Sequence, residues 1–171
     1  MGPGNQRRVS PFVLRALAGI ETGVIAGLAM LGWLLASSAL DRHSIWTIPN
    51  LLGSVFYDRD VLRHSFSWVT MDGLALHFFV SGLIGLVFGI ATGSSRSRLR
   101  VVLLGILTGL LWYYFSEALF WRRLGILARI FGSPRSLLLA HLIFGFVLAR
   151  FPRGLASLER RFYGEPAQSP M

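Results

Sequence analysis

Two histidines stand in strongly apolar segments of the chain, and each is followed at steps of four by small residues. The first series is His77, Ser81, Gly85 and Gly89, and the second is His141, Gly145 and Ala149. Residues four apart lie on the same side of an α-helix, so each series predicts one helix face. In lipid, a polar residue beside a row of small residues marks a face that packs against a neighbouring helix.

A third ionisable residue, Glu117, ends a similar face in another apolar segment, after Gly105, Gly109 and Tyr113. Because successive spans alternate in direction, Glu117 is expected at the same depth as His77 and His141. An ionisable residue within a span usually faces the bundle interior or a water-filled cavity. We therefore treat His77, Glu117 and His141 as a candidate polar cluster.

The chemistry open to this cluster is varied. Two imidazoles and a carboxylate suit a divalent metal, a proton relay or an anionic ligand, and two imidazoles alone suit a haem held from both sides. The alternative is that the histidines form hydrogen bonds between helices and bind nothing. If the histidines only form hydrogen bonds, no cofactor is expected. Haem or a divalent metal is expected only if the histidines act as ligands.

Four apolar runs must position these residues, at 12–40, 72–92, 101–121 and 136–151. The chain of 171 residues is 53% hydrophobic and 15% charged, and its mean hydropathy is +0.57. A crossing needs about 20 apolar residues, so four spans account for nearly the whole chain. The sequence predicts an all-α integral membrane protein, a single membrane domain of four transmembrane helices in two helical hairpins with short interfacial segments. The fourth run is the shortest, and a tilted or re-entrant segment is the alternative there.

A weak internal repeat relates the two halves of the chain. The first and third runs share a Gly-xxx-Gly-Leu element, at Gly23 and Gly27 and again at Gly105 and Gly109, while the second and fourth share the histidine series. Each half would then be one hairpin, with chance recurrence as the alternative. The predicted helix-packing residues are Gly19, Gly23, Gly27, Ser81, Gly85, Gly89, Gly105, Gly109 and Gly145.

Segments outside the runs carry their own expectations. Residues 44–57 contain several aromatics around a Pro-Asn pair and suit a kinked segment at the head-group level. Residues 121–131 alternate arginines with large apolar residues, which is typical of a basic amphipathic helix on a membrane surface. Either segment serves as a membrane anchor or as a lid or docking surface. Residues 164–171 are expected to be a disordered tail.

The net charge of +9 comes from seventeen arginines without a lysine. Ten of the arginines fall on the side of the two termini and seven on the other side, which under the positive-inside rule places both termini in the cytoplasm. We expect the plasma membrane of a bacterium. The arginines are scattered among the spans and form no basic face with exposed aromatics, so nucleic-acid binding is not expected.

The composition also limits the chemistry. Without cysteine there is no disulfide, thiolate nucleophile or Cys-ligated metal. No phosphate loop, zinc-protease or hydrolase motif occurs, so no enzymatic activity is assigned. The first functional hypothesis is a structural or accessory subunit that packs, in the bilayer, against itself or another membrane subunit through its small-residue faces. The alternatives are a small-solute or proton transporter or channel with the His77, Glu117 and His141 cluster, and a bis-histidine haem or metal-binding membrane protein.

Overall fold

The computed structural model describes residues 9–57, 65–93, 97–121 and 133–163, and within these ranges it contains helices and no strand. In chain order they are α1 (Pro11–Leu40), α2 (Thr47–Gly53), α3 (Trp68–Thr92), α4 (Arg98–Ser116), the π-helix η2 (Glu117–Trp121), α7 (Pro134–Leu148) and α8 (Phe151–Tyr163). Four stretches are long and apolar enough to cross a membrane, namely Pro11–Leu40, Trp68–Thr92, Arg98–Leu119 and Pro134–Tyr163. The predicted all-α membrane protein with four spans is confirmed.

Two helices, α3 and α4, begin about one turn earlier than the apolar runs predicted. Helix α3 starts at Trp68 because the Ser67 main-chain N–H donates to Thr70 Oγ1 at 2.9 Å and closes its first turn. Helix α4 starts at Arg98, where Ser97 Oγ accepts the Arg100 N–H at 3.4 Å. Polar capping residues therefore extend both helices beyond their apolar cores.

The fourth span is a bent helix. Helix α7 ends at Leu148, and the next two N–H groups, of Ala149 and Arg150, donate three residues back instead of four. In a continuous helix Pro152 would lack the N–H for a bond to Leu148 O, and its ring would clash with that carbonyl, which accounts for the bend. The run predicted at 136–151 is thus short because the chain changes direction there and continues as an amphipathic helix. Its buried residues, Phe151 and Leu155, pack into the core that includes α1.

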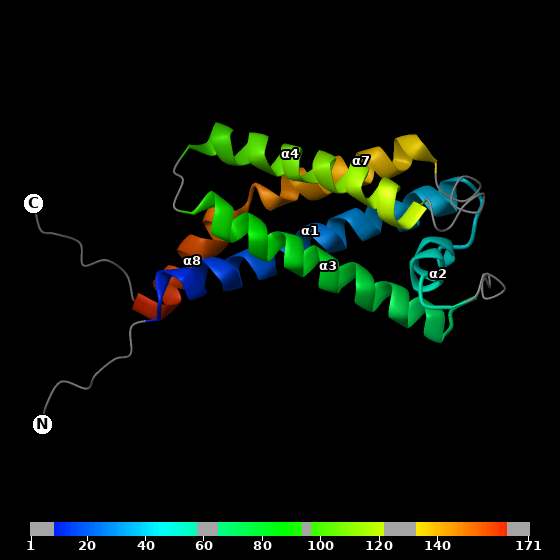
Figure 1. Cartoon of the computed structure of the whole chain (residues 1–171), viewed down its shortest axis with the longest axis horizontal. Coiled ribbons are helices and arrows are strands. Elements are labelled where there is room, and N and C mark those ends of the chain that lie inside the picture. The colour runs from blue at the N-terminus through cyan, green and yellow to red at the C-terminus, as the bar shows by residue number, and fades with distance from the viewer. Residues whose placement is uncertain (1–8, 58–64, 94–96, 122–132, 164–171) are drawn as a thin grey trace, which may run out of the picture.

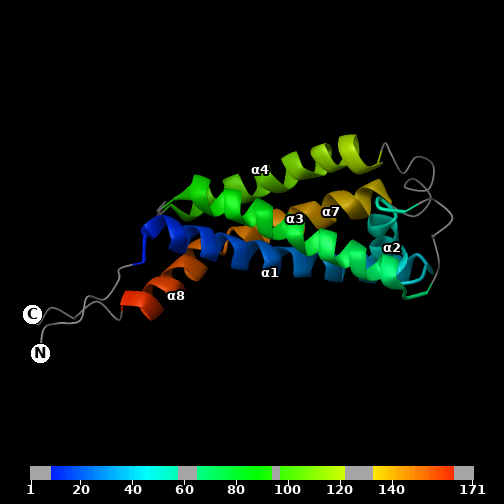
Figure 2. The ribbon, with the colours of Figure 1, turned by 60° about the horizontal axis from the view of Figure 1, so that its bottom comes forward.

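The helices form two antiparallel hairpins, α1 with α3 and α4 with α7 (Figure 1). The hairpins meet mainly through α1 and α7, while α4 diverges from α3 away from the end of the bundle where α3 ends and α4 begins (Figures 1 and 2). Both ends of the described chain lie at the end of the bundle that carries α8, and α2 lies at the opposite end. The two predicted hairpins therefore exist as packed units, and they meet along one side.

Helix α2 lies within the segment expected at the head-group level, but it is largely buried against the start of α3. Asn50 is 1% exposed; its Nδ2 donates to Ser65 O at 3.1 Å, and its Oδ1 accepts the Thr70 hydroxyl. Gly73 allows this approach, since a Cβ there would lie 2.9 Å from the carbonyl carbon of Pro49. Most of the predicted surface helix at 121–131, and all of the tail at 164–171, lie outside the described residues.

Candidate functional site

The small residues of α1 and α3 form a seam along which the two backbones touch. A Cβ on Gly85 would lie 2.6 Å from Gly23 Cα, and one on Gly89 would lie 2.9 Å from Gly19 Cα. At the other end of the seam, a Cβ on Gly27 would lie 2.5 Å from Ser81 Oγ. Real Cβ atoms essentially never come this close to backbone, so glycine is what permits the approach.

The hairpin of α4 and α7 has a seam of the same kind and in the same register. A Cβ on Gly109 would lie 3.3 Å from Gly145 Cα, and one on Gly145 would lie 3.1 Å from Ile106 Cα. A Cβ on Gly105 would meet the carbonyl of Gly145 and the N–H of Ala149, as one on Gly23 would meet the carbonyl of Ser81 and the N–H of Gly85. All nine predicted packing residues lie in these two seams, and the shared register gives the sequence repeat a structural counterpart.

His77 lies where the first seam ends. The residue is 8% exposed, and its Nε2 lies 2.9 Å from the carbonyl oxygen of Gly27 on α1. Because a carbonyl only accepts, Nε2 carries the proton and donates it, which leaves Nδ1 of the neutral ring as an acceptor. The His77 side chain on α3 is thus hydrogen-bonded to the backbone of α1.

His141 occupies the equivalent position on α7 but bonds differently. It is 3% exposed, and its Nδ1 donates to Leu137 O within the same helix at 2.7 Å. Nε2 faces Ser116 Oγ at 3.5 Å, and the Tyr113 ring packs edge-on at 5.4 Å between centroids. Since the Ser116 hydroxyl donates to Tyr113 O at 2.8 Å, Nε2 of His141 is left as an acceptor with only a long contact.

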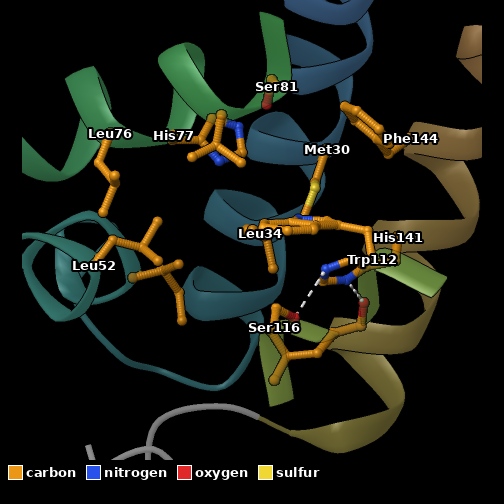
Figure 3. Close-up of a pocket in the computed structure, with 13 residues that line it drawn as sticks. Met30, Leu34, Leu52, Leu76, His77, Ser81, Trp112, Ser116, His141 and Phe144 are labelled. Carbon is orange, nitrogen blue, oxygen red and sulfur yellow. Dashed lines mark hydrogen bonds between the residues drawn. The ribbon is translucent and has the colours of Figure 1, made fainter. Parts of the chain in front are cut away.

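Both histidines line one cavity, of about 70 Å³, where α1, α2, α3, α4 and α7 meet (Figure 3). Ser81, Ser116 and Trp112 contribute the remaining polar atoms. The other lining residues are apolar: Met30, Leu34, Ile48, Leu52, Leu76, Val80, Leu137 and Phe144. A water needs about 10–15 Å³ of such space, so the cavity has room for several waters or a very small solute that donates hydrogen bonds to the imidazoles.

Glu117 does not line this cavity, although His77 and His141 do. It is half-buried and begins the π-helix η2. Each residue of an α-helix turns by about 100°, so Glu117 has rotated by about 120° from Gly105, whereas Ser116 is only about 20° from it. The structure accordingly brings Ser116, and not Glu117, to His141.

Sequence reasoning missed three side chains of this region, Ser116, Trp112 and Trp33. Trp33 Nε1 on α1 donates to the carbonyl and the hydroxyl of Ser136 on α7, both at 3.1 Å, and thereby ties the two hairpins together. Ser116 could have been found from its spacing, because it lies eleven residues after Gly105 and therefore on the same helix face. Nothing in the sequence pairs Trp33 with Ser136, because α1 and α7 are far apart in the chain.

In the described part of the chain, no group of three or more histidine, aspartate, glutamate or cysteine side chains is placed to hold a metal ion. A metal or haem at the cavity would therefore rest on the two imidazoles alone.

From Ser81 towards Gly89, the backbones of α1 and α3 touch along the first seam. A Cβ on Gly23 would lie only 2.8 Å from Gly85 Cα. The cavity is thus closed along α1 and α3 in that direction.

Comparisons with protein-family models, with curated proteins and with solved structures found no match to this chain.

Proposed function

We propose that this small multi-pass membrane protein is a structural or accessory subunit of a membrane assembly. The observation that carries the proposal is that polar side chains of the bundle tie one helix to another: His77 to Gly27 O, Trp33 to Ser136, and Asn50 to Thr70. Such ties, added to two seams of touching backbones, support a bundle of fixed shape. A fixed bundle suits a supporting role in an assembly.

We propose a partner surface other than the small-residue faces named from the sequence. The small-residue faces are buried in contacts between helices of the same chain. A partner would therefore contact large side chains instead. Helix α4 is the least buried of the four spans. Leucines follow one another on its exposed side at steps of four: Leu99, Leu103, Leu107 and Leu111, with exposures of 69%, 57%, 51% and 62%.

The test is the protein mass of the particle in mild detergent or native nanodiscs, taken from the cells that make the protein. We expect an assembly larger than the 19.0 kDa chain. Leu107→Trp on α4 should weaken it, while Leu28→Trp on α1, at a site 60% exposed, should not. A monomer under every mild condition would contradict the proposal.

A second candidate function, a proton or small-solute pathway, is favoured by one observation: His77, His141, Ser81 and Ser116 share a cavity. Purified protein in liposomes with an internal pH-sensitive dye tests it. Proton flux that is lost in both His77→Phe and His141→Phe would support the pathway, and flux equal to that of empty liposomes would exclude it. An absorption spectrum of the same sample tests the bis-histidine haem, since a Soret band lost in both variants is its expected signature.

We further propose that both ends of the described chain lie on the cytoplasmic side of a bacterial plasma membrane. Seven described arginines and two glutamates lie at that end: Arg15, Arg98, Arg100, Arg150, Arg153, Arg160 and Arg161, with Glu21 and Glu159. The opposite end has two described arginines, Arg42 and Arg135, and three described carboxylates, Asp41, Asp72 and Glu117. Over the whole sequence the division is ten arginines to seven, which is in the direction of the positive-inside rule.

Because the chain lacks cysteine, single introduced cysteines report the orientation. A membrane-impermeant maleimide added to intact cells should label Ser133→Cys and should label Ser97→Cys only after permeabilisation. The opposite pattern would reverse the proposed orientation.

A further inference from the structure

The bundle is open between α3 and α4, although its internal repeat predicts that these two helices should be in contact. If the two hairpins were fully equivalent, the contact of α1 with α7 would be matched by a contact of α3 with α4. Instead α4 diverges from α3 (Figures 1 and 2), and an apolar groove of about 330 Å³ separates them. From α3 it is lined between Leu83 and Thr92, and from α4 by Leu104 and Thr108.

The groove has the dimensions of a site for a lipid chain. From Thr92 to Leu83 is nine residues of α3, or about 13 Å along the helix axis, which is nearly half of the ~30 Å hydrocarbon core. A second apolar cleft, of about 320 Å³, lies along α4 and shares Leu104 with the first. Two clefts on either side of Leu104 match the two acyl chains of a phospholipid.

Positive charge lies at one end of these clefts. Arg100 and Ser97 line the second cleft, and Arg98 and Arg100 are both exposed in the first turn of α4. The N-terminus of a helix also carries the positive end of its dipole and favours anionic groups. The described residues of this first turn include no acidic side chain.

We propose that the groove between α3 and α4 binds an anionic phospholipid, with its phosphate at Arg98 and Arg100 and its acyl chains on either side of Leu104. The arginines supply charge complementarity to the head group, and the aliphatic walls accept the chains. The site is distinct from the histidine cavity. Its second cleft includes Leu99, Leu103 and Leu107 of the α4 face proposed above for a partner, so a lipid bound there would lie at the edge of that face.

Native mass spectrometry of the purified full chain, delipidated and then titrated with phosphatidylglycerol or with phosphatidylcholine, tests the site. We expect one tightly retained phosphatidylglycerol. Arg98→Gln with Arg100→Gln should weaken its binding by about five- to thirtyfold, given the attraction typical of one or two arginines at an anionic surface. The control is Arg160→Gln with Arg161→Gln, which removes the same charge from exposed positions at the same end and should change binding less than about twofold.

A second pair of variants tests the groove itself. Ala91→Phe fills it, because Ala91 lines it, and should weaken binding of both lipids. Ile90→Phe, at a position 39% exposed and outside the lining, should leave binding unchanged. Equal retention of the two lipids, equal effects of the two arginine pairs, or unaltered binding in Ala91→Phe would each overturn the proposal.

Discussion

The contrast between Gly85 and Gly82 gives the sharpest prediction about the first seam. Both glycines are buried in α3 and lie three residues apart. A Cβ on Gly85 would lie 2.6 Å from the Cα and 2.8 Å from the N of Gly23, and backbone atoms cannot yield. A Cβ on Gly82 would meet only the side-chain methyls of Ile20 and Val24, at 3.7 Å, which is ordinary van der Waals contact.

The magnitude follows from two opposing effects of a glycine-to-alanine change. Alanine in a helix gains about 0.5–1 kcal/mol over glycine in water, and overpacking costs about 1–3 kcal/mol. Gly85→Ala suffers both effects and should lower the free energy of unfolding by about 1–2 kcal/mol. Gly82→Ala has only the gain, so the two variants should differ by the overpacking cost, about 1–3 kcal/mol.

The assay is equilibrium unfolding in mixed micelles as the fraction of sodium dodecyl sulfate is raised, followed by near-ultraviolet circular dichroism of the tryptophans. Gly145→Ala should behave like Gly85→Ala, because a Cβ there would lie 3.0 Å from the carbonyl carbon of Gly105. Equal stabilities for Gly85→Ala and Gly82→Ala would refute the claim that α1 and α3 touch through their backbones at this register.

Three further predictions concern the polar ties. Trp33→Phe should lower the free energy of unfolding by about 0.5–1.5 kcal/mol in the same assay, because it removes the indole donor to Ser136. Asn50→Ala should cost about 1–3 kcal/mol, since it leaves the buried Thr70 hydroxyl without its acceptor, and should expose the region around α2 to protease before the bundle unfolds. The hydrogen bond from Tyr57 to Asp72 raises the pKa of Tyr57 above 10.0, so its stabilising effect is present below pH 10 and is lost as the pH rises through the folded-state value. Ultraviolet titration of tyrosinate should therefore show a step above pH 10 that Tyr57→Phe removes, and a Tyr57 step at or below pH 10 would contradict this.

The sequence predicted the architecture because bilayer crossing imposes a strong demand on composition. Four apolar runs became four spans, and glycines at steps of four, such as Gly23 and Gly27, indicated which faces pack. Helix ends were less predictable, since capping residues like Ser67 and Ser97 and the bend at Pro152 lie outside the apolar signal. Hydropathy alone cannot locate such ends.

The candidate site was predictable only in part. The shared spacing of His77 and His141 indicated one level of the bundle, and the structure places both at one cavity. Glu117 was assigned by steps of four, and three such steps drift by about 120° around a helix. The tie between Trp33 and Ser136 depends on how the hairpins meet, which no local pattern encodes.

The central claim is that small residues pack α1 against α3 in one fixed antiparallel register, and disulfide cross-linking in native membranes tests it most directly. The chain has no cysteine, and a Cβ on Gly82 would lie 3.7 Å from Ile20 Cγ2, close enough for a disulfide after small adjustment. The Ile20→Cys/Gly82→Cys pair should therefore cross-link rapidly under mild oxidation, and the Ile20→Cys/Leu83→Cys pair, whose second site is 48% exposed, should not. Equal cross-linking of the two pairs, or none in the first, would contradict the register and with it the seams on which the whole account of this bundle depends.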